Sequence, residues 1–144
     1  MNRLAHDLNR FVEAQAPIYP RVIAELAAGA KQSHWMWFIF PQITGLGSSV
    51  MAQRYAIDSR AEAEAYLAHP VLGPRLIECT RLVLGVTGKT IRAILGSPDD
   101  LKFRSSMTLF DAVSDNPIFA EAIEKYYAGE KDQATLATLE RMAG

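Results

Sequence analysis

Hydrophobic side chains recur at intervals of three and four residues along most of the chain, which is the spacing of a helix with one buried face. Residues that begin or end helices separate these segments. Pro17 and Pro20 interrupt the first, and Gly29 ends the second. Ser59 and Glu62 form an S-x-x-E capping box at the start of another, and Asp132 can cap the last helix. Because no alternating strand pattern of useful length occurs, we predict an all-α protein.

Residues 35–40 are the most hydrophobic stretch, and their aromatic side chains are Trp35, Trp37, Phe38 and Phe40. The stretch is apolar on every side whether it is a helix or a strand, so we expect it to be buried. Ser33 as an N-cap and Pro41 as a stop favour one short helix. We predict a compact single-domain bundle, covering residues 1–144, of about seven to nine short helices around this buried aromatic segment.

Polar residues flank the aromatic stretch. Lys31, His34 and Gln42 lie within a few residues of the tryptophans, and each buried indole N–H needs a hydrogen-bond partner. The stretch is therefore either the centre of the core or the wall of a small-molecule pocket with these polar groups at its mouth.

The segment ITGLGSSV, residues 43–50, places Gly45 and Gly47 directly before a helix that Ser48 or Ser49 can cap. Such a loop is either a plain turn or a place where main-chain N–H groups bind phosphate or carboxylate. It is not a dinucleotide-binding fingerprint, because Val50 stands where the third glycine is needed.

A helix predicted over residues 97–113 combines two unlike arcs, with Ser97 as its N-cap and Pro98 at its first position. The polar arc consists of Asp100, Arg104, Thr108 and Asp111. We expect it to face solvent, with an i,i+4 ion pair between Asp100 and Arg104. The opposite, apolar arc includes three polar side chains, which are Lys102, Ser105 and Ser106. A lysine on that arc must extend to water, pair with a carboxylate or contact a ligand.

Composition and charge mainly exclude classes of partner and of binding site. The chain has 15 basic and 16 acidic side chains and a formal net charge of −1, without a long basic run, so nucleic acid and membranes are not expected partners. Cys79 is the only cysteine, which is typical of a reducing compartment. No metal-ligand spacing, signal-peptide pattern or bilayer-length apolar run occurs. We expect a soluble cytoplasmic protein without a metal or cofactor, and the sequence carries no signal for its oligomeric state.

Three blocks resemble the signature of a bacterial family catalogued as a domain of unknown function, some of whose members carry the label calpastatin. The blocks are KQSHWMWFIFPQITGLGSS, YAIDSRAEAEAYLAHPVLGPRLIEC and PDDLKFRSSMTLF, and the resemblance runs from about Asp7 to Leu139. It implies a compact all-α fold and no established activity.

A fainter similarity connects residues 62–67 and 101–106 with the NADAR (YbiA-like) family of α-helical N-glycosidases, which act on ADP-ribose-type and phosphosugar compounds. That family's C-terminal Trp-Gly segment has no match here. The similarity implies N-glycosidic cleavage, in which Glu62 or His34 would act as acid or base.

Two hypotheses follow. In the first, the protein binds a phosphorylated, nucleotide-like or ADP-ribose-like small molecule, with N-glycosidase-like hydrolysis by Glu62 and His34 as an extension. The tryptophans would stack on a ring, and the lysine and glycine-loop groups would hold phosphate. The predicted ligand-binding residues are Lys31, Trp35, Trp37, Gln42, Gly45, Gly47, Ser48, Lys102, Ser105 and Ser106. In the alternative, the protein is a non-enzymatic interaction module whose aromatic segment is only core or a partner-binding patch.

Overall fold

The structure is a computed structural model that describes residues 7–143. Within this range the chain forms ten α-helices and no β-strand, and one isolated parallel bridge joins Ile43 and Ile57. The all-α class is confirmed, with one helix more than the upper end of the predicted number. In chain order the helices are α1 (Asn9–Gln15), α2 (Tyr19–Ala27), α3 (Met36–Ile39), α4 (Val50–Arg54), α5 (Arg60–Ala68), α6 (Leu72–Leu84), α7 (Ile91–Leu95), α8 (Asp99–Ala112), α9 (Ile118–Tyr127) and α10 (Gln133–Ala143).

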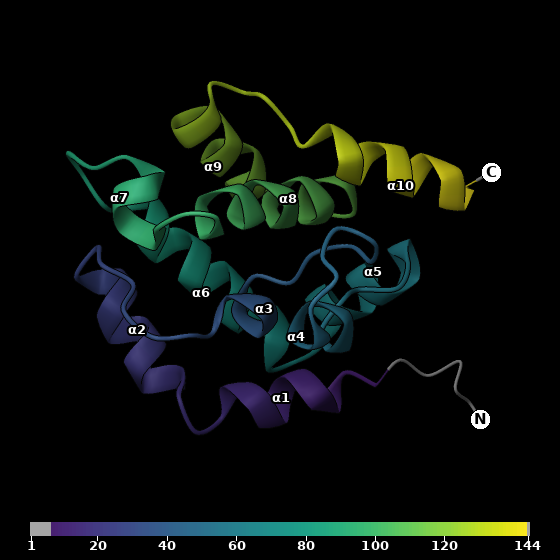
Figure 1. The fold of residues 1–144 in the computed structure, drawn as a ribbon, viewed down its shortest axis with the longest axis horizontal. Helices are drawn as coiled ribbons and strands as arrows, with labels where there is room; N and C mark the ends of the chain where they lie inside the picture. The colour runs from purple at the N-terminus through teal and green to yellow at the C-terminus, as the bar shows by residue number, and fades with distance from the viewer. Residues whose placement is uncertain (1–6, 144) are drawn as a thin grey trace.

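Two helices organise the molecule. Helix α6 packs against α2, α5 and α9, while α8 packs against α5, α7, α9 and α10. In Figure 1 the short helix α3 lies between α1 at the lower edge and α8 above it, so elements from both halves of the chain enclose the aromatic segment. Over residues 7–143, no helix has both the length and the apolar character needed to cross a bilayer.

The predicted aromatic core is confirmed. Rings in tilted or edge contact form a continuous run, which consists of Phe38, Tyr55, Phe11, Tyr66, Phe110 and Phe119. A second group consists of Trp35, Phe40 and Phe103. All of these side chains are buried. Each ring pair stabilises the fold by about 0.5–1.5 kcal/mol beyond the contribution of its buried area. The two groups therefore stabilise the packing of the helices that carry these rings.

The aromatic segment differs from the prediction in its details. Helix α3 is a single turn, because Trp35 and Phe40 have non-helical backbone geometry at its two ends. Ser33 does not cap this helix, since its hydroxyl donates a hydrogen bond to Glu25 instead. Trp37 is half-buried rather than enclosed on every side. The segment is therefore core along most of its length, with one tryptophan at the boundary.

Side-chain caps begin helices at Ser49, Ser59 and Asp132, as the sequence predicts. The start predicted for α8 is wrong. Helix α8 begins at Asp99, after Pro98, and no side chain caps it.

The polar arc predicted for α8 is not a solvent face. Thr108 is buried, and its hydroxyl accepts a hydrogen bond of 3.0 Å from the main-chain N–H of Asp132. Arg104 lies beside Glu130 and Asp132 and makes no ion pair with Asp100. The chain that connects α9 to α10 covers much of this arc, and its polar groups contact Arg104, Thr108 and Asp111.

Glu25 of α2 holds the loop that leads to the aromatic segment. Its carboxylate accepts hydrogen bonds from the main-chain N–H groups of Gln32 and Ser33, from the Ser33 hydroxyl and from the Trp35 indole N–H, at 2.6–3.2 Å. Burial by itself would raise the pKa of Glu25, but these hydrogen bonds outweigh it and lower the pKa to about 2.

We expect Glu25→Gln to lower the free energy of unfolding by about 1–3 kcal/mol at neutral pH, because an amide cannot accept the four hydrogen bonds that the carboxylate accepts. The folded-state pKa of Glu25 lies below its ordinary value of 4.5. Its contribution is therefore complete above pH 4.5 and is lost as the pH falls towards 2. Urea unfolding between pH 7 and pH 2.5 should show the wild type and the variant converging on acidification. The exposed Glu140→Gln serves as control and should show no such convergence.

Candidate functional site

An open groove of about 550 Å³ lies where three segments distant in the sequence meet, namely the loop before α4, the first half of α8 and the start of α10. We call it the α8 groove. Its polar lining residues are Gln42, Ser48, Ser49, Lys102, Arg104, Ser105 and Asp132. Leu46, Pro98 and Leu101 supply apolar surface, and Leu101 is 53% exposed although its arc of α8 was predicted to face the core. The groove therefore combines charged, hydroxyl and apolar groups.

Lys102 reaches the α8 groove from the first turn of α8, and two neighbours orient its side chain. Its Nζ lies 3.7 Å from Asp99 Oδ1 and 5.5 Å from the ring centroid of Trp37. An ion pair and a cation–π contact each favour this placement of the ammonium. With its side chain 28% exposed, Lys102 is neither a core residue nor a side chain extended into water.

Lys31 repeats these contacts at a more buried position. Its Nζ lies 2.9 Å from Asp99 Oδ2 and 4.9 Å from the ring centroid of Trp35, and its side chain is 8% exposed. Asp99 therefore pairs with two lysines, and the cluster of Lys31, Asp99 and Lys102 has one positive charge in excess. Of the two lysines, Lys102 is the one that lines the groove.

Arg104 lies on the side of the groove nearest α10, between two carboxylates. Its Nη1 is 4.0 Å from Glu130 Oε1 and its Nη2 is 3.9 Å from Asp132 Oδ1, which are ion-pair distances too long for hydrogen bonds. The Nε of Arg104 is buried without a hydrogen-bond partner among the described residues. Because Nε is enclosed by protein atoms, the donors that a ligand can use are those of Nη1 and Nη2.

The structure brings together five of the predicted ligand-binding residues in the lining of the α8 groove, which are Gln42, Gly47, Ser48, Lys102 and Ser105. Trp37 and Gly45 line a neighbouring hollow of about 30 Å³, which has room for a water molecule rather than for a ligand.

The remaining predicted residues lie outside the lining of the groove. Trp35 is buried, and its indole N–H donates a hydrogen bond of 2.9 Å to Glu25. Ser106 is fully buried, and its hydroxyl has no hydrogen-bond partner among residues 7–143. His34 is exposed but does not line the groove.

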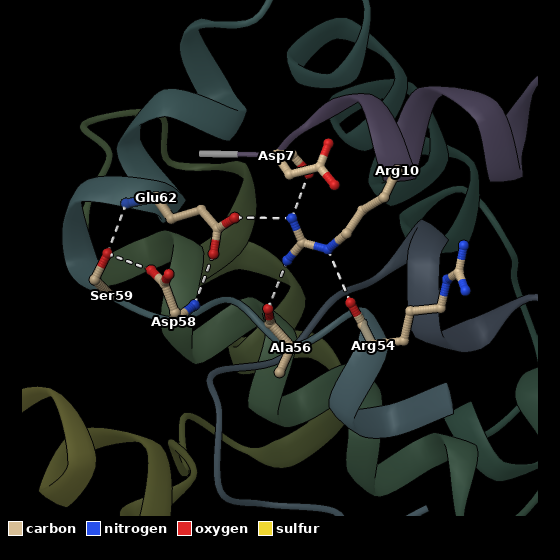
Figure 2. Close-up of polar contacts among 7 residues, drawn as sticks. All are labelled: Asp7, Arg10, Arg54, Ala56, Asp58, Ser59 and Glu62. Carbon is tan, nitrogen blue, oxygen red and sulfur yellow. Dashed lines mark hydrogen bonds and ion pairs between the residues drawn. The ribbon is translucent and has the colours of Figure 1, made fainter. Parts of the chain in front are cut away.

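Glu62 belongs to a separate polar cluster, which Figure 2 shows. Its carboxylate is 2% exposed and accepts hydrogen bonds from Arg10 Nη1 at 3.0 Å and from the main-chain N–H of Asp58 at 2.7 Å. Arg10 also donates to the carbonyl oxygens of Arg54 and Ala56, each at 2.8 Å. Both oxygens of Glu62 thus hold α1, α5 and the chain after α4 together.

Sequence reasoning missed two charged residues of the groove. Arg104 was predicted to face solvent, and Asp132 was predicted only to cap a helix. Neither segment contains a pattern that indicates their proximity, because it depends on how the connection between α9 and α10 packs on α8. No group of His, Cys, Asp and Glu side chains within the described range is arranged to hold a metal ion.

Comparisons with known proteins agree with this fold. The family model described as "Protein of unknown function (DUF1810)" matches residues 5–139. The crystal structure of a conserved hypothetical protein from Mycobacterium tuberculosis is similar, with 57% sequence identity, coverage of 93% of this chain and 96% of that chain, and a TM-score of 0.92. No curated protein matches the chain. The comparisons show neither the calpastatin label nor a relationship to the NADAR family.

Proposed function

We propose that this chain, which belongs to the DUF1810 family of proteins of unknown function, binds a phosphorylated small molecule in the α8 groove. The observation that carries the proposal is the position of Lys102, an ammonium oriented by Asp99 and Trp37 at the edge of a groove that also presents hydroxyl groups. A cation and hydroxyl donors that converge on one cavity are groups that bind phosphate esters. Ser48 and Ser49 supply the hydroxyl donors here, because the Ser105 hydroxyl already donates to the carbonyl of Leu101.

The charge around Lys102 supports binding of an anion. One carboxylate, Asp99, lies between the two ammonium groups of Lys31 and Lys102. An incoming phosphate therefore gains a favourable interaction with the excess positive charge, and it does not have to displace an optimal ion pair, because the 3.7 Å contact of Lys102 is loose. Lys102 would contact the phosphate, and Lys31 would support it from behind.

The size and lining of the α8 groove support a ligand with a ring. A volume of about 550 Å³ falls within the range of about 300–1,000 Å³ that is usual for small-molecule sites. Leu46 and Leu101 offer apolar surface to a ring, while Ser48, Ser105 and Gln42 offer hydrogen bonds to sugar hydroxyls. A nucleotide-like or ADP-ribose-like compound has this combination of groups.

We expect Lys102→Met to weaken the binding of phosphorylated ligands by about 10- to 30-fold, because it removes a charge-assisted hydrogen bond. A ligand at about 100 times its Kd should stabilise the wild type by about 2.7 kcal/mol and this variant by only about 1 kcal/mol. Thermal unfolding with a panel of nucleotides and ADP-ribose measures both values. The exposed Arg21→Met, on α2, removes a positive charge elsewhere and should behave as the wild type. If no phosphorylated compound stabilises the wild type, the proposal is wrong.

Hydrolysis is a separate prediction. Cleavage of an N-glycosidic bond by Glu62 or His34 would need these residues to contact a ligand, and neither lines the α8 groove. An assay for release of the base from nucleotides and ADP-ribose, with Glu62→Gln and His34→Ala as variants, tests it directly. Product formed at equal rates by both variants and the wild type would exclude these two residues from the chemistry.

The alternative function, a non-enzymatic interaction module, has one observation in its favour. Val50 is 81% exposed and Leu101 is 53% exposed, and both belong to the elements that border the α8 groove. Exposed apolar side chains near one another can mark a protein interface. Failure of every phosphorylated ligand, together with self-association in sedimentation that Val50→Lys abolishes, would favour this alternative.

A further inference from the structure

The proposed function does not specify which chemical group lies at the end of the ligand opposite its phosphate. The charged residues of the groove indicate one. Resting on that proposed function, we infer that the α8 groove selects a nucleoside monophosphate whose base carries an amino group beside a ring hydrogen-bond acceptor, as adenine and cytosine do. The groove has unequal charge on its two sides, and each side fits one end of such a molecule.

The side of the groove near α3 is positive. Two ammonium groups, those of Lys31 and Lys102, share the carboxylate of Asp99, which leaves one positive charge in excess. Lys102 is the member of this cluster that lines the groove. The phosphate of the ligand is expected on this side.

The side of the groove near α10 has no excess positive charge. The guanidinium of Arg104 lies beside the carboxylate of Asp132, which also lines the groove, and beside that of Glu130, which is 82% exposed and outside the lining. Asp132 Oδ2 accepts hydrogen bonds from the N–H and hydroxyl of Thr135, at 3.0 and 2.6 Å, and so is already occupied. Oδ1 lies only at ion-pair distance from Arg104, so it can accept a hydrogen bond from a ligand.

The two sides lie on different arcs of α8. Lys102 and Arg104 are two positions apart on this helix, which directs their side chains about 200° apart around its axis. Leu101 and Ser105, at helical positions between those arcs, also line the groove, so the groove crosses the helix from the Lys102 side to the Arg104 side.

The groups on the α10 side match the edge of an amino-substituted base. Asp132 Oδ1 can accept a hydrogen bond from an exocyclic amino group, and an Nη group of Arg104 can donate to the adjacent ring nitrogen. A second phosphate on this side would meet the carboxylate of Asp132 without an excess of positive charge, so a bisphosphate does not fit as well. A base with a carbonyl in place of the amino group presents an acceptor to Asp132 and leaves that carboxylate unpaired.

Isothermal titration calorimetry with AMP, IMP and ribose 5-phosphate tests the inference. AMP and IMP differ at the base edge, where IMP has a carbonyl beside a ring N–H in place of the amino group beside a ring acceptor. We expect the wild type to bind AMP about 10-fold or more tightly than IMP. Lys102→Met should weaken both nucleotides by a similar factor and leave their ratio unchanged.

The matched variant is Asp132→Asn, because asparagine is a good N-cap that can also donate a hydrogen bond to the carbonyl of IMP. We expect it to reduce the preference for AMP below about threefold. Asp132→Ser keeps a capping oxygen without the carboxylate and should lose the preference as well, which provides a second measurement if α10 is perturbed in the first variant. Equal affinity of the wild type for AMP and IMP, or an unchanged ratio in both Asp132 variants, would overturn the inference while phosphate binding stands. Absence of binding by all three compounds would overturn the proposed function itself.

Discussion

Arg10→Met is expected to lower the free energy of unfolding by about 3–5 kcal/mol, because it leaves a buried carboxylate without its charged partner. Glu62 is 2% exposed and pairs with Arg10 at 3.0 Å. The same guanidinium donates hydrogen bonds to the carbonyl oxygens of Asp7, Arg54 and Ala56 (Figure 2), so the substitution also removes the donors of three main-chain acceptors. The cluster connects the start of α1 with the end of α4 and the start of α5.

Urea denaturation of the wild type, Arg10→Met, a double variant and a control separates the contribution of the ion pair to stability from that of the other contacts of Arg10. We expect the double variant Arg10→Met, Glu62→Gln to be more stable than Arg10→Met alone, since it no longer buries an unpaired charge. The control is Arg92→Met on α7, an exposed arginine whose replacement should change stability by less than about 0.5 kcal/mol. If Arg10→Met matched this control, the cluster in Figure 2 would contribute nothing measurable to the fold.

Phe110→Ala is the second substitution with a large expected effect, a loss of about 3–5 kcal/mol. The ring of Phe110 is fully buried on α8, with its centroid 5.4 Å from that of Tyr66 and 5.9 Å from that of Phe119. It joins α5, α8 and α9 within the continuous run of aromatic rings. Its removal costs transfer free energy and leaves a cavity that close-packed neighbours cannot fill.

Leu101→Ala is the matched control, because it removes a large apolar side chain from the same helix at a position that is 53% exposed. We expect its free energy of unfolding to stay within about 0.5 kcal/mol of the wild type. Equilibrium unfolding followed by circular dichroism measures both variants. A similar cost for the two substitutions would contradict the assignment of Phe110 to the centre of the core.

Local features of the sequence were sufficient to predict the class of fold and much of its interior. The helical spacing of apolar residues, the caps at Ser49, Ser59 and Asp132, and the buried stretch around Trp35 are all found in the structure. Each depends on residues within a few positions of one another, which one helical turn or one cap brings into contact. The exact start of α8 was not predicted in this way, because a Ser-Pro pair is compatible with more than one register at a helix start.

The candidate site depended on contacts that no local pattern contains. Periodicity assigned Arg104 and Thr108 to solvent because they are polar, but a neighbouring segment of chain, here the one that ends at Asp132, can contact polar groups in place of water. Lys102 was recognised as unusual from its arc, yet its contact with Trp37 arises only when α8 packs beside α3. The sequence determined that most of the apolar side chains leave water, because burial of a large apolar side chain is favourable wherever it occurs, but it did not determine the exceptions, such as the exposed Leu101 and the buried Thr108. Tertiary packing alone determined which polar groups meet, because their partners are distant along the chain and only the folded chain brings them within hydrogen-bond or ion-pair distance.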